Sequence, residues 1–82
     1  MATDNRGYAT KIVAANKAAN QASPGVKLGQ YCISREIPVH DVAEFFGVSR
    51  MTIYKWFTGE WIPRKVHEEK IVEMLKRVGF LS

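Results

Sequence analysis

Residues 43–56, with the sequence AEFFGVSRMTIYKW, carry the strongest structural pattern in this chain. Apolar residues recur at helical spacing on both sides of Gly47, which predicts two short helices joined by a tight turn. Gly47 allows the positive φ that a helix end needs, and the Ser49 hydroxyl can cap the second helix. Ala43 is small enough to let the two helices cross closely. The pattern predicts a helix-turn-helix whose second helix can enter a DNA major groove.

A purely structural helical hairpin is the alternative, because alanine and glycine are common residues. DNA binding is favoured because a set of small, apolar and turn-forming residues keeps the spacing of a helix-turn-helix beyond the turn itself. Its members are Ala43, Gly47, Val48, Ser49, Ile53, Trp56, Gly59 and Pro63.

The run GVSRMTIYKWFTGEWIP, residues 47–63, resembles the lambda-repressor-like, or Cro/repressor-type, helix-turn-helix family. In that family a Gly-hydrophobic-Ser turn precedes a short recognition helix, a glycine follows it, and a proline precedes the last helix. The resemblance extends more weakly over residues 24–80. It implies an all-α, compact bundle of about five helices that is usually dimeric on DNA. Phe57 departs from the pattern, since the family often has an acidic residue there, and the segment between Pro63 and Gly79 departs in length by about one turn.

Two regions are expected along the chain. Residues 1–22 form an N-terminal extension that is Ala-rich and predicted to be helical over residues 8–21; a flexible arm, or an arm whose Arg6, Lys11 and Lys17 lie against DNA, is the alternative. Residues 23–82 form the helix-turn-helix domain, with helices over residues 24–36, from near Pro38, and over residues 64–78. The last helix is expected to turn one set of residues inward, namely Val66, Ile71, Met74, Leu75 and Val78.

The residues that face DNA follow from helical geometry. If Ile53, Trp56 and Phe57 face the core, the opposite face of the same helix presents the candidate base contacts Arg50, Met51, Tyr54 and Lys55. An arginine can grip guanine O6 and N7, a methionine or tyrosine can lie against a thymine methyl, and a lysine can reach guanine or phosphate. The expected contacts to the DNA backbone are His40, Ser49, Thr52, Thr58, Arg64 and Lys65.

Most aromatic residues in the central segment are expected in the core. Trp61 is open, because it lies in a connecting loop beside Ile62. It can pack over the core edge, lie beside the sugar-phosphate chain, or join a dimer contact.

Composition agrees with a small basic binding domain. The chain has 82 residues, a net charge of +4 and 46% hydrophobic residues, which is enough for one folded core. Residues 49–65 carry Arg50, Lys55, Arg64 and Lys65 against Glu60 alone, so positive charge gathers on the second helix of the motif and the loop after it.

Several classes of protein are not indicated. The single cysteine, Cys32, excludes an internal disulfide and is expected in the core as a small hydrophobe. Neither His40 nor His67 has metal-ligand spacing to Cys32, and no catalytic constellation is present, so no enzyme, metal site, cofactor or small-molecule ligand is expected. The sequence contains no secretory or membrane-spanning segment, which predicts a cytoplasmic protein without membrane partners.

The expected function is sequence-specific binding of double-stranded DNA by a transcriptional regulator, a small repressor of phage or mobile-element type. The alternative is a protein-interaction module that binds a host polymerase or nuclease component. A homodimer, at least on DNA, is expected. Val78, Phe80 and Leu81 at the C-terminus are its predicted surface, and the Ala-rich N-terminal helix is the competing one.

Overall fold

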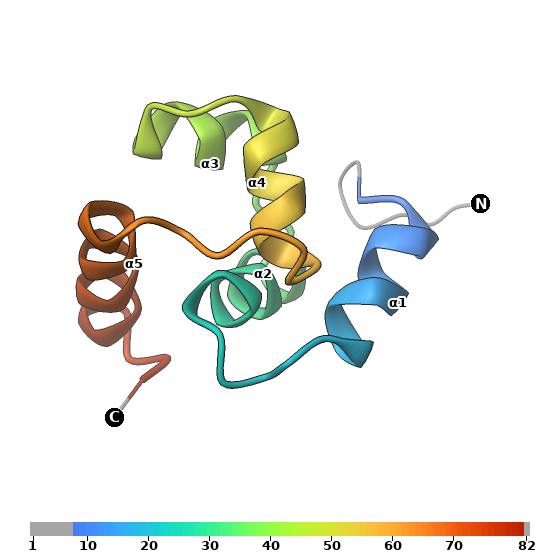
Figure 1. Cartoon of the computed structure of the whole chain (residues 1–82), viewed down its shortest axis with the longest axis horizontal. Coiled ribbons are helices and arrows are strands. Elements are labelled where there is room, and N and C mark those ends of the chain that lie inside the picture. Colours follow the sequence, from blue (N-terminus) through green and yellow to red (C-terminus); the bar gives the residue numbers. More distant parts are fainter. Residues whose placement is uncertain (1–7, 82) are drawn as a thin grey trace.

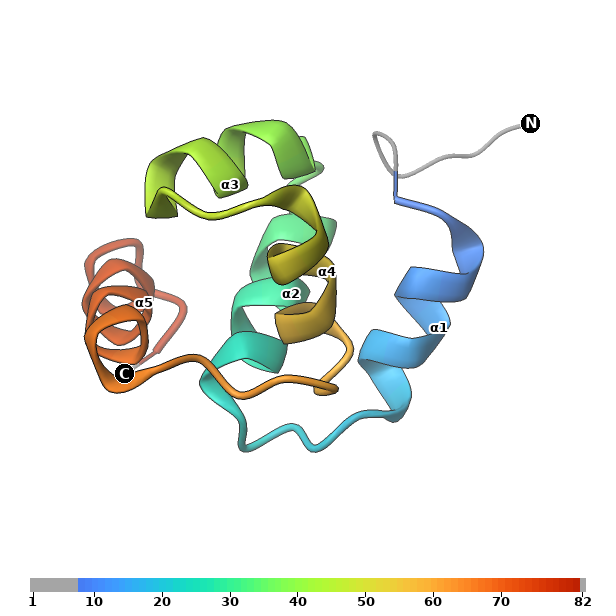
Figure 2. The same ribbon diagram turned by 45° about the horizontal axis from the view of Figure 1, so that its top comes forward.

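Helices account for all regular secondary structure in residues 8–81, the part of the chain that the computed structural model describes. They are α1 (Thr10–Ala18), α2 (Pro24–Ser34), α3 (Val39–Phe46), α4 (Arg50–Phe57) and α5 (Lys65–Arg77). With five helices and no strand in this range, the expected all-α class is confirmed. In Figures 1 and 2, α2 and α4 lie between α1 on one side and α5 on the other.

The hydrophobic core is centred on α4. Ile53 and Phe57 are fully buried and Trp56 is nearly so, as helical spacing predicted. Three other helices, α2, α3 and α5, and the segment before α1 contribute a second set of buried apolar side chains, namely Tyr8, Leu28, Cys32, Val42, Ala43, Phe46, Ile71 and Leu75. One face of α4 is therefore committed to packing, which leaves its opposite face for solvent or a partner.

Two glycines in α2 allow that helix to lie directly against α4. A Cβ atom on Gly25 would lie 2.9 Å from the carbonyl oxygen of Trp56. A Cβ on Gly29 would lie 2.9 Å from the Phe57 ring and 2.5 Å from the Asn16 amide nitrogen. Non-bonded atoms do not approach so closely, so any larger residue at these positions forces the helices apart.

The N-terminal helix is shorter than expected, because α1 covers Thr10–Ala18 rather than residues 8–21. Tyr8 precedes the helix and is buried: its ring centroid lies 5.8 Å from that of Phe57, and its hydroxyl donates to the Ile37 carbonyl at 2.7 Å. Arg6, which the arm interpretation would place on DNA, lies outside the described residues. From Tyr8 onward, the extension is packed against the bundle.

A buried asparagine joins α1 to both central helices. Asn16 is 2% exposed, and its Nδ2 atom donates to the carbonyl oxygens of Val26 at 3.1 Å and Phe57 at 2.8 Å. Phe57 is the last residue of α4, so its carbonyl has no partner within that helix. Without the Asn16 amide, this carbonyl would be left unpaired in the interior. Helical spacing did not reveal this residue, because apolar periodicity does not identify a buried polar side chain.

The inward face of α5 is narrower than predicted. Ile71 and Leu75 are fully buried, and Met74 packs partly against the core. Val66 and Val78, both expected inside, are 67% and 40% exposed, and that part of the prediction is wrong. Val66 lies five residues before Ile71, roughly 140° around the helix, and Val78 is the C-cap residue beyond the last helical turn.

The C-terminal residues fold back on the bundle. Gly79 has φ 80°, and the backbone N–H groups of Phe80 and Leu81 both donate to the carbonyl of Leu75, at 2.9 and 3.2 Å. The Phe80 ring meets Tyr31 edge-on with centroids 5.6 Å apart, and Leu81 packs against the core. Much of the apolar surface predicted for a dimer contact is thus used within the chain.

Burial also suppresses ionisation in the core. It raises the pKa of the Cys32 thiol to about 12, and it raises the pKa of the Tyr8 hydroxyl above its usual value. Both groups stay neutral and serve as packing and hydrogen-bonding side chains.

We expect Asn16→Asp to lower the free energy of unfolding by about 2 kcal/mol or more, because a carboxylate cannot donate to the two carbonyls that Asn16 bonds. Urea denaturation measures the change. Lys17→Ala, at the exposed neighbouring position, is the control and should cost less than about 0.5 kcal/mol. Equal losses for the two variants would contradict the role of Asn16.

Candidate nucleic-acid interface

A three-residue turn joins α3 to α4 and has the geometry expected of a helix-turn-helix. Gly47 adopts φ 70° and ψ 33°, the left-handed conformation predicted for it. Its N–H donates to Glu44 O at 3.2 Å, and the Val48 N–H donates to Ala43 O at 3.0 Å, which closes the end of α3. Ala43, which was expected where the two helices cross, is 5% exposed. The turn thus fixes where α4 begins.

Ser49 caps the start of α4, as predicted. Its Oγ atom accepts a hydrogen bond from the Thr52 N–H at 3.1 Å and lies 3.0 Å from the Thr52 hydroxyl oxygen. Both residues were expected to contact the DNA backbone. Their hydroxyls are engaged with each other, so their first role is to order the first turn of α4.

The side chains on the outward face of α4 differ in how far they are exposed. Arg50 and Met51 are exposed, Met51 to 62%, while Tyr54 is partly buried and packs against the core. The face therefore offers an arginine and a thioether at its first turn and only part of a tyrosine ring one turn later. Thr58 follows the helix, and its hydroxyl donates to the Lys55 carbonyl at 3.3 Å.

Lys55 is held by the loop that follows its own helix. Its ammonium nitrogen lies 2.9 Å from a carboxylate oxygen of Glu60 and 5.8 Å from the centroid of the Trp61 ring. The loop folds back because Gly59 has φ 79° and the Trp61 N–H donates to the Lys55 carbonyl at 3.1 Å. A DNA contact by Lys55 therefore requires exchange of the Glu60 carboxylate for a base or phosphate.

Two further basic residues flank this face. Arg64 is the N-cap of α5 and Lys65 is its first residue, and both are exposed. A hollow of about 510 Å³ has Thr52 and Arg64 among its lining residues, so the structure brings these two expected backbone contacts together. Arg50, Arg64 and Lys65 make no ion pair with any other residue between 8 and 81.

His40 has a different neighbourhood. It lies on α3 with Asp41 and Glu44, and ligand atoms of the three exposed side chains lie within 4.8 Å of one another. A phosphate approaching His40 would meet two carboxylates. These three residues have i, i+1, i+4 spacing on α3, and exposed acidic groups of this kind are common on protein surfaces.

Lys70 links α5 to the end of α3, and the sequence analysis did not single it out. Its ammonium group donates to the carbonyl of Phe45 at 3.0 Å. The same group lies 4.7 Å from the Phe45 ring centroid and 5.6 Å from that of Phe46. Lys70 thereby ties α5 to the last turn of α3, whose final carbonyls need partners.

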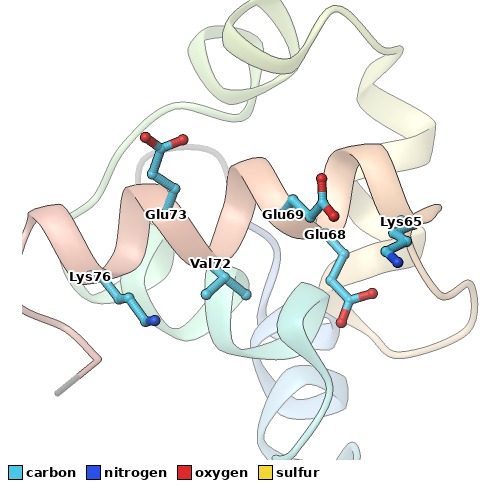
Figure 3. A pocket seen from close by; sticks show the side chains of 6 residues that line it. All are labelled: Lys65, Glu68, Glu69, Val72, Glu73 and Lys76. Atoms are coloured by element: carbon cyan, nitrogen blue, oxygen red, sulfur yellow. The ribbon is translucent and has the colours of Figure 1, made fainter.

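A side face of α5 carries charges of both signs. It borders a hollow of about 540 Å³ that is lined by Lys65, Glu68, Glu69, Val72, Glu73 and Lys76. Figure 3 shows the two lysines at the ends of this face and the glutamates between them, with Val72 as the single apolar residue. This mixture of charges of both signs is typical of a solvated helix face.

Comparisons of the chain with family models, with characterised proteins and with solved structures found no match. Within residues 8–81, no helix combines the length and apolarity needed to cross a bilayer. The case for a function therefore depends on the residues and geometry described above.

Ser49→Ala should lower the free energy of unfolding by about 1 kcal/mol, because the Thr52 N–H loses its acceptor. Thermal or urea denaturation measures the loss, and Ser49→Asp should retain most of the stability, since a carboxylate also caps. Ser34→Ala is the matched control, because Ser34 is the last residue of α2 and its hydroxyl donates to the Tyr31 carbonyl instead of capping a helix N-terminus. If the two alanine variants lose the same amount, Ser49 is not an effective cap.

Proposed function

We propose that this chain binds double-stranded DNA sequence-specifically, with α4 as the recognition helix. The observation that carries the proposal is the exposed Arg50 at the start of a Ser49-capped helix whose opposite face is buried in the core. A helix anchored in this way holds its outward side chains in fixed positions, and the first residues of a recognition helix reach deepest into the major groove.

In this proposal the base contacts differ in kind. Arg50 donates two hydrogen bonds to guanine O6 and N7, and Met51 packs on a thymine methyl group. Tyr54 is partly buried against the core, so less of its side chain is available. Lys55 reaches guanine after release from Glu60. Specificity thus depends mainly on Arg50 and Met51.

The backbone contacts come from both sides of α4. Arg64 and Lys65 are charged, exposed and without ion-pair partners among the described residues, so they are the main phosphate contacts. Ser49, Thr52 and Thr58 add hydroxyls at the helix ends. His40 contributes less than we expected from the sequence, because Asp41 and Glu44 surround it with negative charge.

With α4 as its DNA-binding helix, the protein acts as a small cytoplasmic transcriptional regulator, a repressor of phage or mobile-element type. Its control comes from its own concentration, a partner or competition at the operator. The second candidate function is a protein-interaction module. It is favoured by a different observation, the exposure of Trp61 and Ile62 on the loop after α4 and of Val66 in the first turn of α5.

We expect binding of duplex DNA to weaken steeply with salt. If about four basic side chains per subunit meet phosphates, the logarithm of affinity should fall against log salt with a slope of about −3 to −4 per subunit. Lys65→Ala should reduce that slope by about 1 and weaken all sequences alike. Arg50→Ala should cost about 1–3 kcal/mol on the preferred site and relax preference at one base pair.

Fluorescence anisotropy on selected and random duplexes measures both effects. A slope near zero, or no binding of any duplex at low salt, would end the DNA proposal in favour of the interaction module. Equal losses on selected and random DNA for Arg50→Ala would show that α4 does not read bases.

A second prediction concerns Glu60. Glu60→Gln should tighten binding to random duplex several-fold and steepen the salt slope by about 1, because Lys55 becomes free to meet a phosphate. Adding Lys55→Ala to the Glu60→Gln chain should abolish the gain in affinity. Glu69→Gln, on α5, is the control: it removes the same charge but does not release Lys55, so any change in affinity that it causes should be unaffected by Lys55→Ala. A gain that persists without Lys55 would mean that Glu60 acts only through net charge.

A further inference from the structure

The hollow of about 510 Å³ lies between α4 and the start of α5. Its lining residues come from the turn before α4, from α4 itself, from the first turn of α5 and from the loop that joins these helices in Figures 1 and 2. Small-molecule sites in proteins have volumes of about 300–1,000 Å³, so this hollow is large enough to be one. The proposed DNA contacts use Thr52 and Arg64 and give the rest of the hollow no role.

A buried tryptophan brings an unused hydrogen-bond donor to this hollow. Trp56 borders the hollow and is 3% exposed, and its rings meet Phe46 edge-on at 5.9 Å and His67 at 5.3 Å between centroids. Among residues 8–81, no group accepts a hydrogen bond from its indole N–H. Buried tryptophan N–H groups usually have an acceptor. The Trp56 nitrogen is not sealed in the interior, so an acceptor can reach it from the hollow.

The other polar residues of the hollow favour an acceptor with negative charge. Arg64 is exposed and forms no ion pair with any residue between 8 and 81. His67 adds a ring nitrogen that can donate, and Thr52 adds a hydroxyl. No Asp or Glu is found among the described residues that line the hollow. A cation would be repelled by Arg64 without meeting a compensating carboxylate, so the hollow selects an oxyanion.

The remaining walls are apolar, and they are formed by Val48, Trp61 and Ile62. Trp61 and Ile62 are 47% and 75% exposed, so a ligand can cover them without displacing a core residue. A flat aromatic ring packs well on an exposed indole. An inorganic ion would leave these apolar walls in water, whereas a hydrocarbon would leave Arg64 and the Trp56 N–H without a partner. The lining therefore fits a ligand that carries both an aromatic ring and an oxyanion.

We propose that this hollow binds a small aromatic carboxylate. The carboxylate accepts hydrogen bonds from Arg64 and from the indole N–H of Trp56, and the ring lies against Trp61. The sequence predicted no small-molecule ligand, because the lining residues come from several segments and form no motif. The site does not depend on the proposed DNA binding.

Proton–nitrogen NMR correlation spectra test the proposal. The chain has two tryptophans and therefore two indole N–H signals, which Trp61→Phe assigns. Addition of naphthalene-2-carboxylate should move the Trp56 indole proton downfield to a saturating value, because the N–H gains a charged acceptor. Naphthalene-2-carboxamide has the same ring without the charge and should bind about tenfold more weakly.

Two variants separate the hollow from the general charge of the chain. Arg64→Gln should raise the dissociation constant for naphthalene-2-carboxylate about tenfold, because the ligand loses its charged donor. Lys76→Gln is the matched control, since it removes the same charge from an exposed residue in the last turn of α5, and it should change the constant less than about twofold. Circular dichroism melting verifies that both variants fold.

A Trp56 signal that does not respond to naphthalene-2-carboxylate, or equal weakening by the two variants, would overturn the proposal. An equally strong response to inorganic phosphate or to a short DNA duplex would also overturn it, because the hollow would then serve simple anions or the DNA backbone. Binding of the carboxylate by a chain that binds no duplex would support this site and count only against the DNA proposal.

Discussion

The direct contact between α2 and α4 is the constraint on which the rest of the structure depends. Gly25 and Gly29 let the two backbones approach so closely that an added Cβ would meet Trp56 or Phe57 at 2.9 Å. This approach buries one face of α4 completely and fixes the direction of the other. Asn16 completes the junction, because its amide pairs carbonyls of both helices that the close packing shields from water. The candidate recognition surface is thus a consequence of a glycine contact on the far side of the helix.

Contacts from α5, as well as the turn itself, stabilise the pair of helices α3 and α4. Lys70 of α5 satisfies the Phe45 carbonyl and covers two aromatic rings at the end of α3. Gly47 and Ser49 then set the end of one helix and the beginning of the next. Because α4 has only eight residues, its stability comes from these tertiary contacts rather than from its own helical propensity.

The surface around α4 combines charge, aromatic and aliphatic groups. Among residues 8–81, Arg50, Arg64 and Lys65 form no ion pair, while Lys55 is held by Glu60 and Trp61. The ion pair lies partly in solvent, so in the proposed DNA complex its loss would cost little.

Local sequence determined much of this structure. Helical spacing placed Ile53, Trp56 and Phe57 inside, and Gly47 and Ser49 adopted the predicted turn and cap, because backbone sterics and capping act over a few neighbouring residues. Periodicity could not show that Asn16 is buried, that Val66 is exposed, or that Lys55 is paired. Those outcomes depend on which helices meet and on how far each extends, and such contacts between residues distant in the chain were decided only by the tertiary structure.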